Sequence, residues 1–489
     1  MNNKIAIIES VALEPHLETS GEIAIDFKKK NHEVVFFWAG YDLSWHDWDI
    51  DFISKILGGS INKKVVNFEN ILSSRGIKVR KIDNDIDSNN IKIWSDSFCG
   101  NLNKLKNYKY KNCNLGIGVA SSLISYFNDY NFNPILELKK VRSLLFCSAL
   151  IYERVLFFLK IENPNKVLTF NGRFATCLPI VRAAEKLKIQ VLRHERGSNF
   201  DKYEIYQNGV HDINYIQKKV SYYWRNNKNK NKIIKAQSFF NLRINRKPIG
   251  VDQGKVFVSN QKKGLLPELP ANKRIVVFYT TSNHEYAAVS NFEFNQIQAF
   301  KKMLKVINNF PDIYLVIRVH PNNNRKNNID DKLWTQFSNY KKICVITSQD
   351  AYDTYALMIR ADIVVSYSST IALEASYFGK PSVVLKKFWW TQKKSILLID
   401  NIRDLSKIFN KNYKFKKIKK TACLPVANYI LNYGKKFRYY KPESFYKGKF
   451  LGQTLTWKSY LIRFFELFSL NFYYLFLKKK FLYFYNTYL

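Results

Sequence analysis

The sequence is poor in cysteine and in acidic residues. Its six cysteines form no C-x-x-C pair, and none clusters with histidine at the spacing of a zinc site, which argues against a disulfide scaffold and a structural zinc. Only 39 Asp and Glu stand against 78 Lys and Arg, so the formal net charge is +39. Glycine and proline number 18 and 12, which excludes collagen-like and low-complexity chains.

A leader is also lacking. The opening MNNKIAIIES has no basic region followed by an apolar one, so we expect a cytoplasmic protein. The 489 residues, 46% of them apolar, suffice for two or three domains with their own cores. Codon usage explains part of the lysine content, because AT-rich codons favour Lys, Asn, Ile, Tyr and Phe, and all five are abundant. A basic chain can also bind nucleic acid, anionic lipid or a phosphorylated substrate.

The first half contains two strand–loop–helix–strand units. The first consists of a strand over 5–8, a polar loop over 9–21, a helix over 22–30 capped by Thr19 or Ser20, and a strand over 34–38. The second consists of a strand over 167–170, a helix over 179–187, a strand over 190–192, and polar loops at 171–173 and 193–197. Between them only two helices are recognisable, at 117–127 and 134–158. The pattern predicts a parallel α/β sheet.

The second half alternates more regularly. A basic, Asn-rich segment over 225–273 predicts the domain boundary. The strands that follow are expected at 274–279, 313–319, 343–346, 362–366 and 382–385, and the helices at 294–308, 351–359 and 370–378. This order predicts a second doubly wound domain. We therefore expect an N-terminal domain over 1–255, a C-terminal domain over 256–425, and a return helix with a tail over 426–489.

Three hydroxyls and a carboxylate follow the strand predicted at 362–366. Ser368, Ser369 and Thr370 stand at the start of the next helix, where free backbone N–H groups and hydroxyls can bind phosphate. Glu374 lies one turn later, at a reach that suits the hydroxyls of a ribose. An ordinary capped helix would explain the hydroxyls alone. Glu374 and the following Gly-Lys-Pro favour a nucleotide site.

Two more strand ends of this domain carry polar side chains. Arg318 and His320 end one strand, and Ser282 and Asn283 follow the strand over 274–279. Because the carboxyl ends of parallel strands face one crevice, we expect all four near the same ligand. A cation and an imidazole there can stabilise a departing phosphate.

The order of His-Pro after one strand, then Ser-Ser-Thr, Glu-Ala and Gly-Lys-Pro, resembles the capsule polysaccharide biosynthesis proteins, which include Kdo transferases of bacterial capsule and O-antigen assembly. The resemblance implies a GT-B architecture: two Rossmann-like domains face a cleft, and the C-terminal one binds the nucleotide-sugar. It implies that His320 and residues 368–370 hold the donor phosphate and Glu374 the ribose. Three N-terminal segments also look like that family, at 15–22, 171–173 and 194–197.

Sugar transfer needs a carboxylate or a histidine near the acceptor hydroxyl. The candidates in the N-terminal half are Glu18, Glu22 and Glu195, with His16 as an alternative base. Glu22 can instead be a favourable charge at a helix start, and Glu195 an ion-pair partner of a neighbouring arginine. Asp-x-Asp pairs occur between 47 and 87, away from the nucleotide half, and we interpret them as acidic loop residues. We expect no metal and no cofactor.

The sequence thus predicts a glycosyltransferase that moves a sugar from a nucleotide-sugar, such as CMP-Kdo, to a growing capsule or O-antigen glycan. The acceptor would be lipid-linked or a polysaccharide. One alternative is a polyol-phosphate transferase that uses CDP-glycerol. The other is a basic nucleic-acid-binding protein, which we do not favour because the basic residues form no known binding motif.

The C-terminal stretch over 401–489 has 19 Lys and Arg against 3 Asp and Glu, and its end mixes aromatics with lysine. Its longest charge-free run within 457–489 has 11 residues, at 467–477, too short to span a bilayer, which takes about 20. We expect 400–433 to pack on the N-terminal domain. The basic aromatic helical tail would lie on the anionic inner-membrane surface, which makes the enzyme peripheral.

Overall fold

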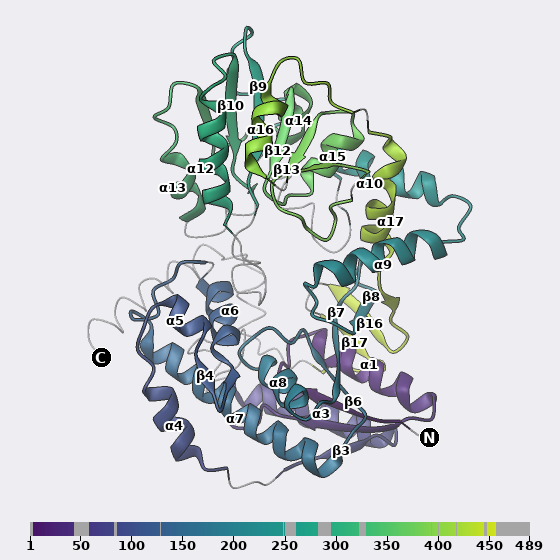
Figure 1. The fold of residues 1–489 in the computed structure, drawn as a ribbon. Helices are drawn as coiled ribbons and strands as arrows, with labels where there is room; N and C mark the ends of the chain where they lie inside the picture. Colours follow the sequence, from purple (N-terminus) through teal and green to yellow (C-terminus); the bar gives the residue numbers. More distant parts are fainter. Residues whose placement is uncertain are drawn as a thin grey trace.

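Two lobes, each built on its own β-sheet, make up the fold (Figure 1). The computed structural model describes residues 3–43, 58–82, 86–127, 129–247, 249, 261–281, 295–321, 329–392, 394–399, 401–416, 418–444 and 447–455. The predicted fold class, α/β with two Rossmann-like units in a GT-B arrangement, is confirmed. The predicted helical tail lies outside the described residues.

The first sheet has seven strands in the order β15-β8-β7-β6-β1-β2-β3. They are β1 (Lys4–Glu9), β2 (Glu33–Trp38), β3 (Lys78–Arg80), β6 (Lys166–Phe170), β7 (Gln190–Arg196), β8 (Lys202–Tyr206) and β15 (Lys435–Lys436). The central strand β1 runs parallel to both neighbours, so that Ile7 lies opposite Phe36 and Leu168. Only β8 runs opposite to the other strands, so its pairings with β7 and with β15 are antiparallel.

Alternating side chains of β1 point to two different cores. Ile5 and Ile7 pack under the helices α1 (His16–Lys29) and α3 (Gly58–Ser74). Ala6 and Ile8 pack under α7 (Leu138–Glu162) and α8 (Leu178–Lys186). Helices on both faces explain why the strand is a continuous apolar run, because parallel sheets are buried on both sides.

The prediction of a polar loop over 9–21 is wrong for its second half, which is helical. Helix α1 begins at His16, six residues before the predicted start, and Thr19 and Ser20 lie inside it and do not cap it. Their hydroxyls bond to Pro15 O at 2.7 Å and to Glu9 Oε1 at 2.7 Å. The sequence of this helical turn predicts a loop because polar side chains rarely occupy a buried helix face. In the structure the hydroxyls of Thr19 and Ser20 are hydrogen-bonded, so they can be buried.

The predicted loop over 193–197 is also corrected. Strand β7 continues to Arg196 because β8 pairs with it antiparallel, with Arg193 opposite Tyr206 and Glu195 opposite Glu204. A hairpin partner of this kind leaves no signal in β7 itself. The structure therefore places Glu195 on a strand.

The segment between the two predicted units is mostly helical. It forms α4 (Ser88–Asp96), α5 (Leu102–Lys106), α6 (Gly116–Phe127) and a small hairpin of β4 (Lys109–Tyr110) and β5 (Cys113–Asn114). Helices α5 and α6 and the start of α7 share one core around Leu123 and Leu144. Of the Asp-x-Asp residues, Asp87 caps α4 through two backbone N–H groups, and those at 47–51 and 83–85 lie outside the described residues.

The second sheet is wholly parallel, in the order β11-β10-β9-β12-β13-β14. Its strands are β9 (Arg274–Tyr279), β10 (Ile313–Arg318), β11 (Ile343–Ile346), β12 (Ile363–Ser366), β13 (Ser382–Val384) and β14 (Leu397–Leu398). Helices α12 (Gln296–Ile307), α13 (Ile329–Thr335) and α16 (Leu405–Phe409) share the core of one face. Helices α14 (Thr354–Arg360) and α15 (Ile371–Tyr377) share the core of the other.

A helical hairpin and the end of the chain join the lobes. Helices α9 (Ile213–Asn226) and α10 (Lys232–Ile244) pack with α17 (Leu424–Asn432) and with α15 of the second lobe. The ring of Phe240 stacks on Tyr377 with their centroids 3.8 Å apart. The prediction that 400–433 packs on the N-terminal domain is partly wrong, because α16 lies in the core of the second lobe and only α17 packs on α9 and α10. The domain limits at 255 and 425 stay a prediction.

After α17 the chain crosses back to the first sheet. Strand β15 pairs with β8, and the hairpin of β16 (Tyr440–Ser444) and β17 (Lys447–Phe450) adds Tyr440 and Phe450 to the core beside α1. Gly21 is required in α1 because a Cβ atom there would come within 2.6 Å of the Phe450 ring. No helix in the described ranges is both long enough and apolar enough to span a membrane.

Candidate active site

A cationic pocket lies at the carboxyl ends of β9 and β10. Five basic residues line it: Arg243 from the last turn of α10, Arg246 and Lys247 from the segment directly after that helix, and Arg318 and His320 from the end of β10. Thr280, Ser369 and Thr370 add hydroxyls to the same wall. Such a lining suits a ligand with several negative charges.

Arg318 is the most buried cation of this pocket, with 1% of its surface exposed. Its Nε lies 3.3 Å from Thr354 Oγ1, and Nη1 donates to the carbonyl of Thr347. Its Nη2 is buried and has no hydrogen-bond partner within the described part of the chain. Burial lowers the pKa of Arg318 to about 10, so the side chain is still a cation at neutral pH and one donor remains for a ligand.

Glu374 is fully buried beneath the pocket. Its Oε2 accepts a 2.7 Å hydrogen bond from the hydroxyl of Tyr355, and its Oε1 lies 3.3 Å from Arg243 Nη2. Burial disfavours the charge of Arg243, but the Glu374 carboxylate outweighs this and raises the pKa of Arg243 above its ordinary value. The ribose contact of Glu374 stays a prediction, and in this structure its carboxylate positions Arg243.

The expected hydroxyls divide into two groups. Ser369 and Thr370 line the pocket, and Thr370 Oγ1 also lies 3.4 Å from Glu374 Oε1. Ser368 is buried, and its backbone N–H donates to Thr281 Oγ1 at 3.3 Å. The backbone N–H of His320 donates to Thr280 Oγ1 at 2.9 Å, which fixes the end of β10 against that of β9. Ser282 and Asn283 lie outside the described residues.

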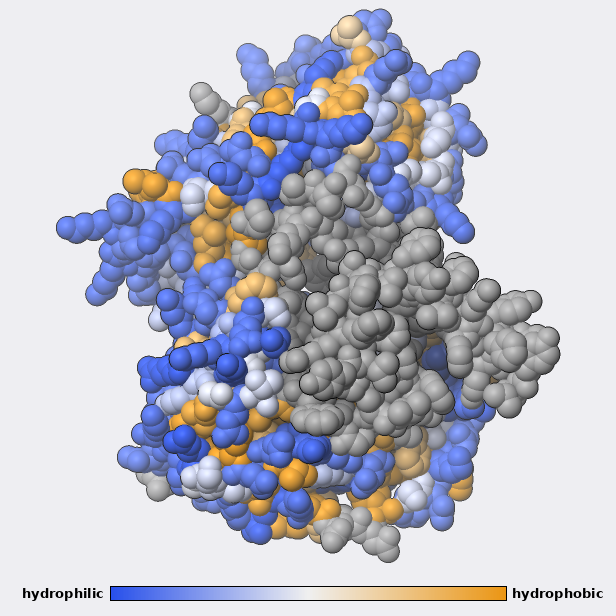
Figure 2. Space-filling view, turned by 180° about the vertical axis from the view of Figure 1, so that it is seen from behind, coloured by the Kyte–Doolittle hydropathy of each residue, from blue (hydrophilic) through white to orange (hydrophobic). Residues whose placement is uncertain are grey.

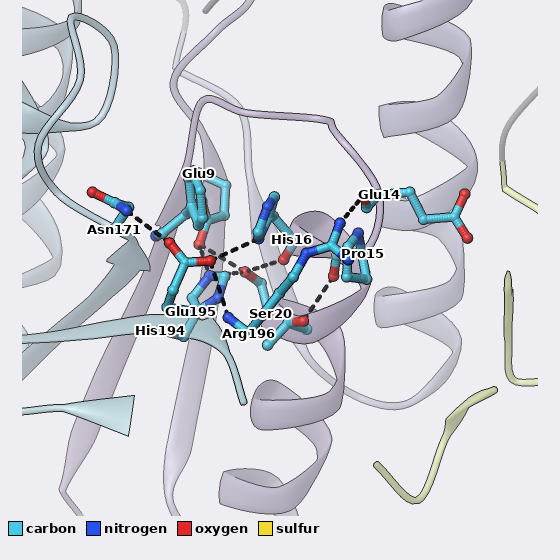
Figure 3. Close-up of polar contacts among 11 residues, drawn as sticks. Glu9, Glu14, Pro15, His16, Ser20, Asn171, His194, Glu195 and Arg196 are labelled. Carbon is cyan, nitrogen blue, oxygen red and sulfur yellow. Dashed lines mark hydrogen bonds and ion pairs between the residues drawn. The ribbon is translucent and has the colours of Figure 1, made fainter. Parts of the chain in front are cut away.

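A second polar cluster lies in the first lobe, where β1, β7 and α1 meet (Figure 3). Glu9 Oε1 accepts from Ser20 Oγ at 2.7 Å and lies 2.9 Å from His194 Nε2. The backbone N–H of Phe170 donates to Glu9 Oε2 at 3.3 Å. Glu9, Ser20 and His194 have no exposed surface, so this group fixes the strands and has no access to substrate.

His16 and Glu195 lie beside this group. His16 Nδ1 is 3.9 Å from Glu195 Oε1, and the Glu195 carboxylate accepts from Asn171 Nδ2 at 2.7 Å. Figure 3 shows Glu195 between Asn171 and His16. Gly172, with φ of +82°, follows Asn171 and allows the tight turn that presents this amide. Burial lowers the pKa of His16 well below its ordinary value, with a contribution from the nearby Arg196.

Exposure separates the four predicted catalytic candidates. The side chain of Glu195 is 26% exposed and that of His16 8%. Glu18 is buried and lies 2.7 Å from Lys64 Nζ. Glu22 accepts hydrogen bonds from the backbone N–H groups of residues 438, 439 and 440 at 2.7 to 3.1 Å. Glu195 is therefore the carboxylate with the best access to a substrate.

Several functional residues are missed by the sequence reasoning. Arg243, Arg246 and Lys247 fall in the segment interpreted as a basic boundary. Because α10 ends at Ile244, they share no helical spacing that could have singled them out. Glu9 gave no signal of its own, because its partners Ser20 and His194 are distant in the chain. The sequence singled out His194 only as part of the segment 194–197. Among the described residues no three His, Cys, Asp or Glu side chains are grouped to bind a metal, and the expected absence of a metal stays a prediction.

One protein-family model matches part of the second lobe. Residues 278–404 match the family model described as UDP-N-acetylglucosamine 2-epimerase, and no curated protein matches the chain. Among solved structures, a Thermosulfurimonas dismutans KpsC, beta Kdo 2,4 transferase, has 12% identity and a TM-score of 0.37 over 55% of this chain and 80% of its own. The Methanocaldococcus jannaschii UDP-GlcNAc 2-epimerase has 13% identity and a TM-score of 0.25 over 86% and 98%.

The family match covers most of the second sheet, including Arg318, His320 and Glu374. It supports an enzyme of the GT-B type, which is the coarser part of the expected resemblance. It does not single out the capsule polysaccharide proteins. The second lobe of this chain is similar to UDP-N-acetylglucosamine 2-epimerases.

Proposed function

We propose that the chain is a glycosyltransferase that binds the phosphates of a nucleotide-sugar in the cationic pocket of the second lobe. The observation that carries the proposal is the buried Arg318 with a donor left over, beside three more cations from the last turn of α10 and the segment after it. A buried guanidinium is costly unless an anion satisfies it. The match of this lobe to a nucleotide-sugar enzyme family supports the same ligand class.

The proposed chemistry divides between the lobes. An acceptor hydroxyl attacks the anomeric carbon of the sugar, the bond from that carbon to the phosphate oxygen breaks, and the nucleotide leaves with the electron pair. Arg318, Arg243 and His320 would neutralise the leaving phosphate. Glu195 would take the hydroxyl proton, with the Asn171 side chain and the backbone N–H of Arg196 fixing its orientation.

The finer parts of the proposal rest on the motif resemblance. We propose a CMP-activated donor such as CMP-Kdo, and a lipid-linked or polysaccharide acceptor of capsule or O-antigen assembly. We also propose that the tail beyond residue 456 holds the enzyme peripherally on the inner membrane. A CDP-glycerol-type polyol-phosphate transferase would use the same pocket, and the nucleic-acid-binding alternative is not supported by a pocket of this kind.

A second candidate function is epimerisation of the sugar on its nucleotide, which the family match favours. An epimerase needs no acceptor, and its product is again a nucleotide-sugar. A transferase releases the nucleotide only when an acceptor is present. Incubation with UDP-N-acetylglucosamine and with CMP-Kdo, each without an acceptor and followed by NMR, separates the two functions.

Nucleotide binding is the first test. CMP, CDP, UDP and GDP are compared by thermal shift, and the one that binds should raise the melting temperature. Lys247→Ala, at an exposed residue of the pocket rim, should weaken nucleotide binding about fivefold to thirtyfold, since a charged hydrogen bond contributes about 1–2 kcal/mol. Arg403→Ala, at an exposed residue in η3 (Ile402–Asp404), is the control and should bind normally. If no nucleotide binds, the pocket has another ligand.

A further inference from the structure

The tip of the α9–α10 hairpin is strongly basic. From Lys218 to Lys235 the chain has seven Lys and Arg and no Asp or Glu. In Figure 1 this hairpin projects from the body of the molecule on the right, away from both sheets. Five of the cations, at 218, 225, 228, 230 and 235, are exposed.

Large apolar side chains are exposed at the same tip. Ile234 is 66% exposed, Ile233 46% and Tyr222 60%. In Figure 2 the projection lies at the left edge, with an orange apolar spot among blue side chains. Exposed apolar groups within a basic surface are typical of segments that lie at a membrane interface.

The cations of the tip are not explained by pairing with acids. Lys219 pairs with Glu204 at 2.6 Å, and Lys232 lies over the ring of Trp224 at 4.9 Å, both toward the body of the hairpin. No ion pair among the described residues involves Lys228, Lys230 or Lys235. Their charge is therefore available to a polyanionic partner.

We propose that the tip of the α9–α10 hairpin docks on an anionic lipid surface, with Ile233 and Ile234 entering the headgroup layer and the lysines pairing with lipid phosphates. Lipid fits better than nucleic acid because adjacent isoleucines gain from an apolar interface, whereas a phosphate backbone offers them nothing. This surface shares no residue with the lining of the nucleotide pocket.

The other end of α10 carries the pocket cation Arg243. Eleven residues separate Arg243 from Lys232, which corresponds to roughly 17 Å along a helix. A docked tip would therefore hold the nucleotide pocket close to the membrane surface, where a lipid-linked acceptor is presented.

The test is flotation of the full-length protein with vesicles of equal parts phosphatidylglycerol and phosphatidylethanolamine. Lys228→Glu with Lys230→Glu should lower the partition coefficient at least about tenfold, since each cation near such a surface contributes about 1 kcal/mol. Ile233→Ser with Ile234→Ser should lower it several-fold. The matched controls are Lys301→Glu with Lys302→Glu on α12, and Ile93→Ser with Leu136→Ser; both should float like the unchanged protein.

A local reporter separates the tip from the tail. A polarity-sensitive dye on Asn229→Cys, with the exposed Cys99 replaced by serine, should shift to the blue with these vesicles and not with phosphatidylcholine. The same dye on Asn309→Cys should not respond. Unchanged flotation of both hairpin variants, or a silent dye at 229 on bound protein, would overturn the proposal. Binding of an oligonucleotide by the unchanged protein is measured in parallel. If the hairpin variants lose that binding and still float, the tip binds nucleic acid and not lipid.

Discussion

Single glutamates of the first lobe have the same charge and different roles. Glu18 pairs with Lys64, Glu22 receives three backbone N–H groups, and Glu9 bonds to Ser20 and His194. Each of them is buried. Glu195 alone of the predicted carboxylates combines an ordered carboxylate with exposed surface. The environment, more than the residue type, therefore decides which glutamate can meet a substrate.

Glu195→Gln is expected to abolish transfer without affecting nucleotide binding. Gln keeps the size of the side chain but takes up a proton poorly, so kcat should fall roughly 10²- to 10⁴-fold. Steady-state kinetics and nucleotide titration measure the two quantities. Glu185→Gln, an exposed partner of Arg182, is the matched control and should be fully active. Normal turnover of Glu195→Gln would place the base elsewhere.

Glu162 is expected to make the free energy of unfolding depend on pH in the acidic range. Burial alone would raise its pKa, but hydrogen bonds from Lys4, Arg80 and Lys78 outweigh this and lower it from 4.5 to about 2. A carboxylate whose pKa is lower in the folded state stabilises the fold above its unfolded pKa, and the contribution is lost as the pH falls through the folded pKa.

Glu162→Gln should therefore lower the free energy of unfolding by about 1–2 kcal/mol near neutral pH, less than the full shift implies because Lys78 and Arg80 are half exposed. The difference from the unchanged protein should shrink as the pH falls from about 4.5 toward 2. Urea unfolding at several pH values measures it, with Glu185→Gln as control. A difference independent of pH would show that the ion pairs do not act through this carboxylate.

Helix α1 is an element whose acidic residues all face protein. Glu18, Glu22 and Asp26 of this helix, and Glu14 just before it, are spaced four residues apart and are all buried. Tyr440 donates to Glu14 at 3.1 Å, and Lys435 lies 3.3 Å from Asp26. The row of acids therefore binds the returning chain at 435–440, and this accounts for part of the basic charge near the C-terminus.

Glu22→Ala should loosen that returning chain. The change leaves three backbone N–H groups buried without an acceptor, and we expect a loss of about 2–5 kcal/mol in the free energy of unfolding. Hydrogen exchange at residues 438–440 should rise first, because those are the donors. Glu33→Ala, at an exposed residue of β2, should change neither. Protection that persists at 438–440 would contradict the assigned role.

The whole molecule is closed by its own C-terminal chain. Helix α17 packs on α9 and α10, and residues 435–455 complete the sheet and the core of the first lobe. The second lobe obtains its cations Arg243, Arg246 and Lys247 from α10 and the segment directly after it, so its pocket depends on the element that joins the lobes.

Two truncations test this closure. A chain that ends at Leu455 should keep a melting temperature near that of the full chain and bind nucleotide, because it retains β15–β17 and the core side chains Tyr440, Phe450 and Leu455. A chain that ends at Asn432 should melt at a much lower temperature, since it loses β15–β17 and exposes the buried acids of α1. Equal melting of the two truncated chains would show that the return is dispensable.

The sequence by itself determined the alternation of buried strands and helices in the second lobe, and the strand ends with Arg318, His320 and Ser369. These were predictable because parallel strands are continuous apolar runs and polar residues follow their carboxyl ends. The same rule identified β1, β2 and β6 in the first lobe.

Only the tertiary structure decided the rest. The helix over 16–29, the length of β7, and the burial of Glu18 and Glu22 depend on partners as far away as residues 64, 204 and 440. The pocket cations at the end of α10 and directly after it depend on the packing of α10 with α15. Polar side chains in a buried helix contradict the local pattern, and hydrogen bonds between residues far apart in the chain, which no local pattern encodes, satisfy them.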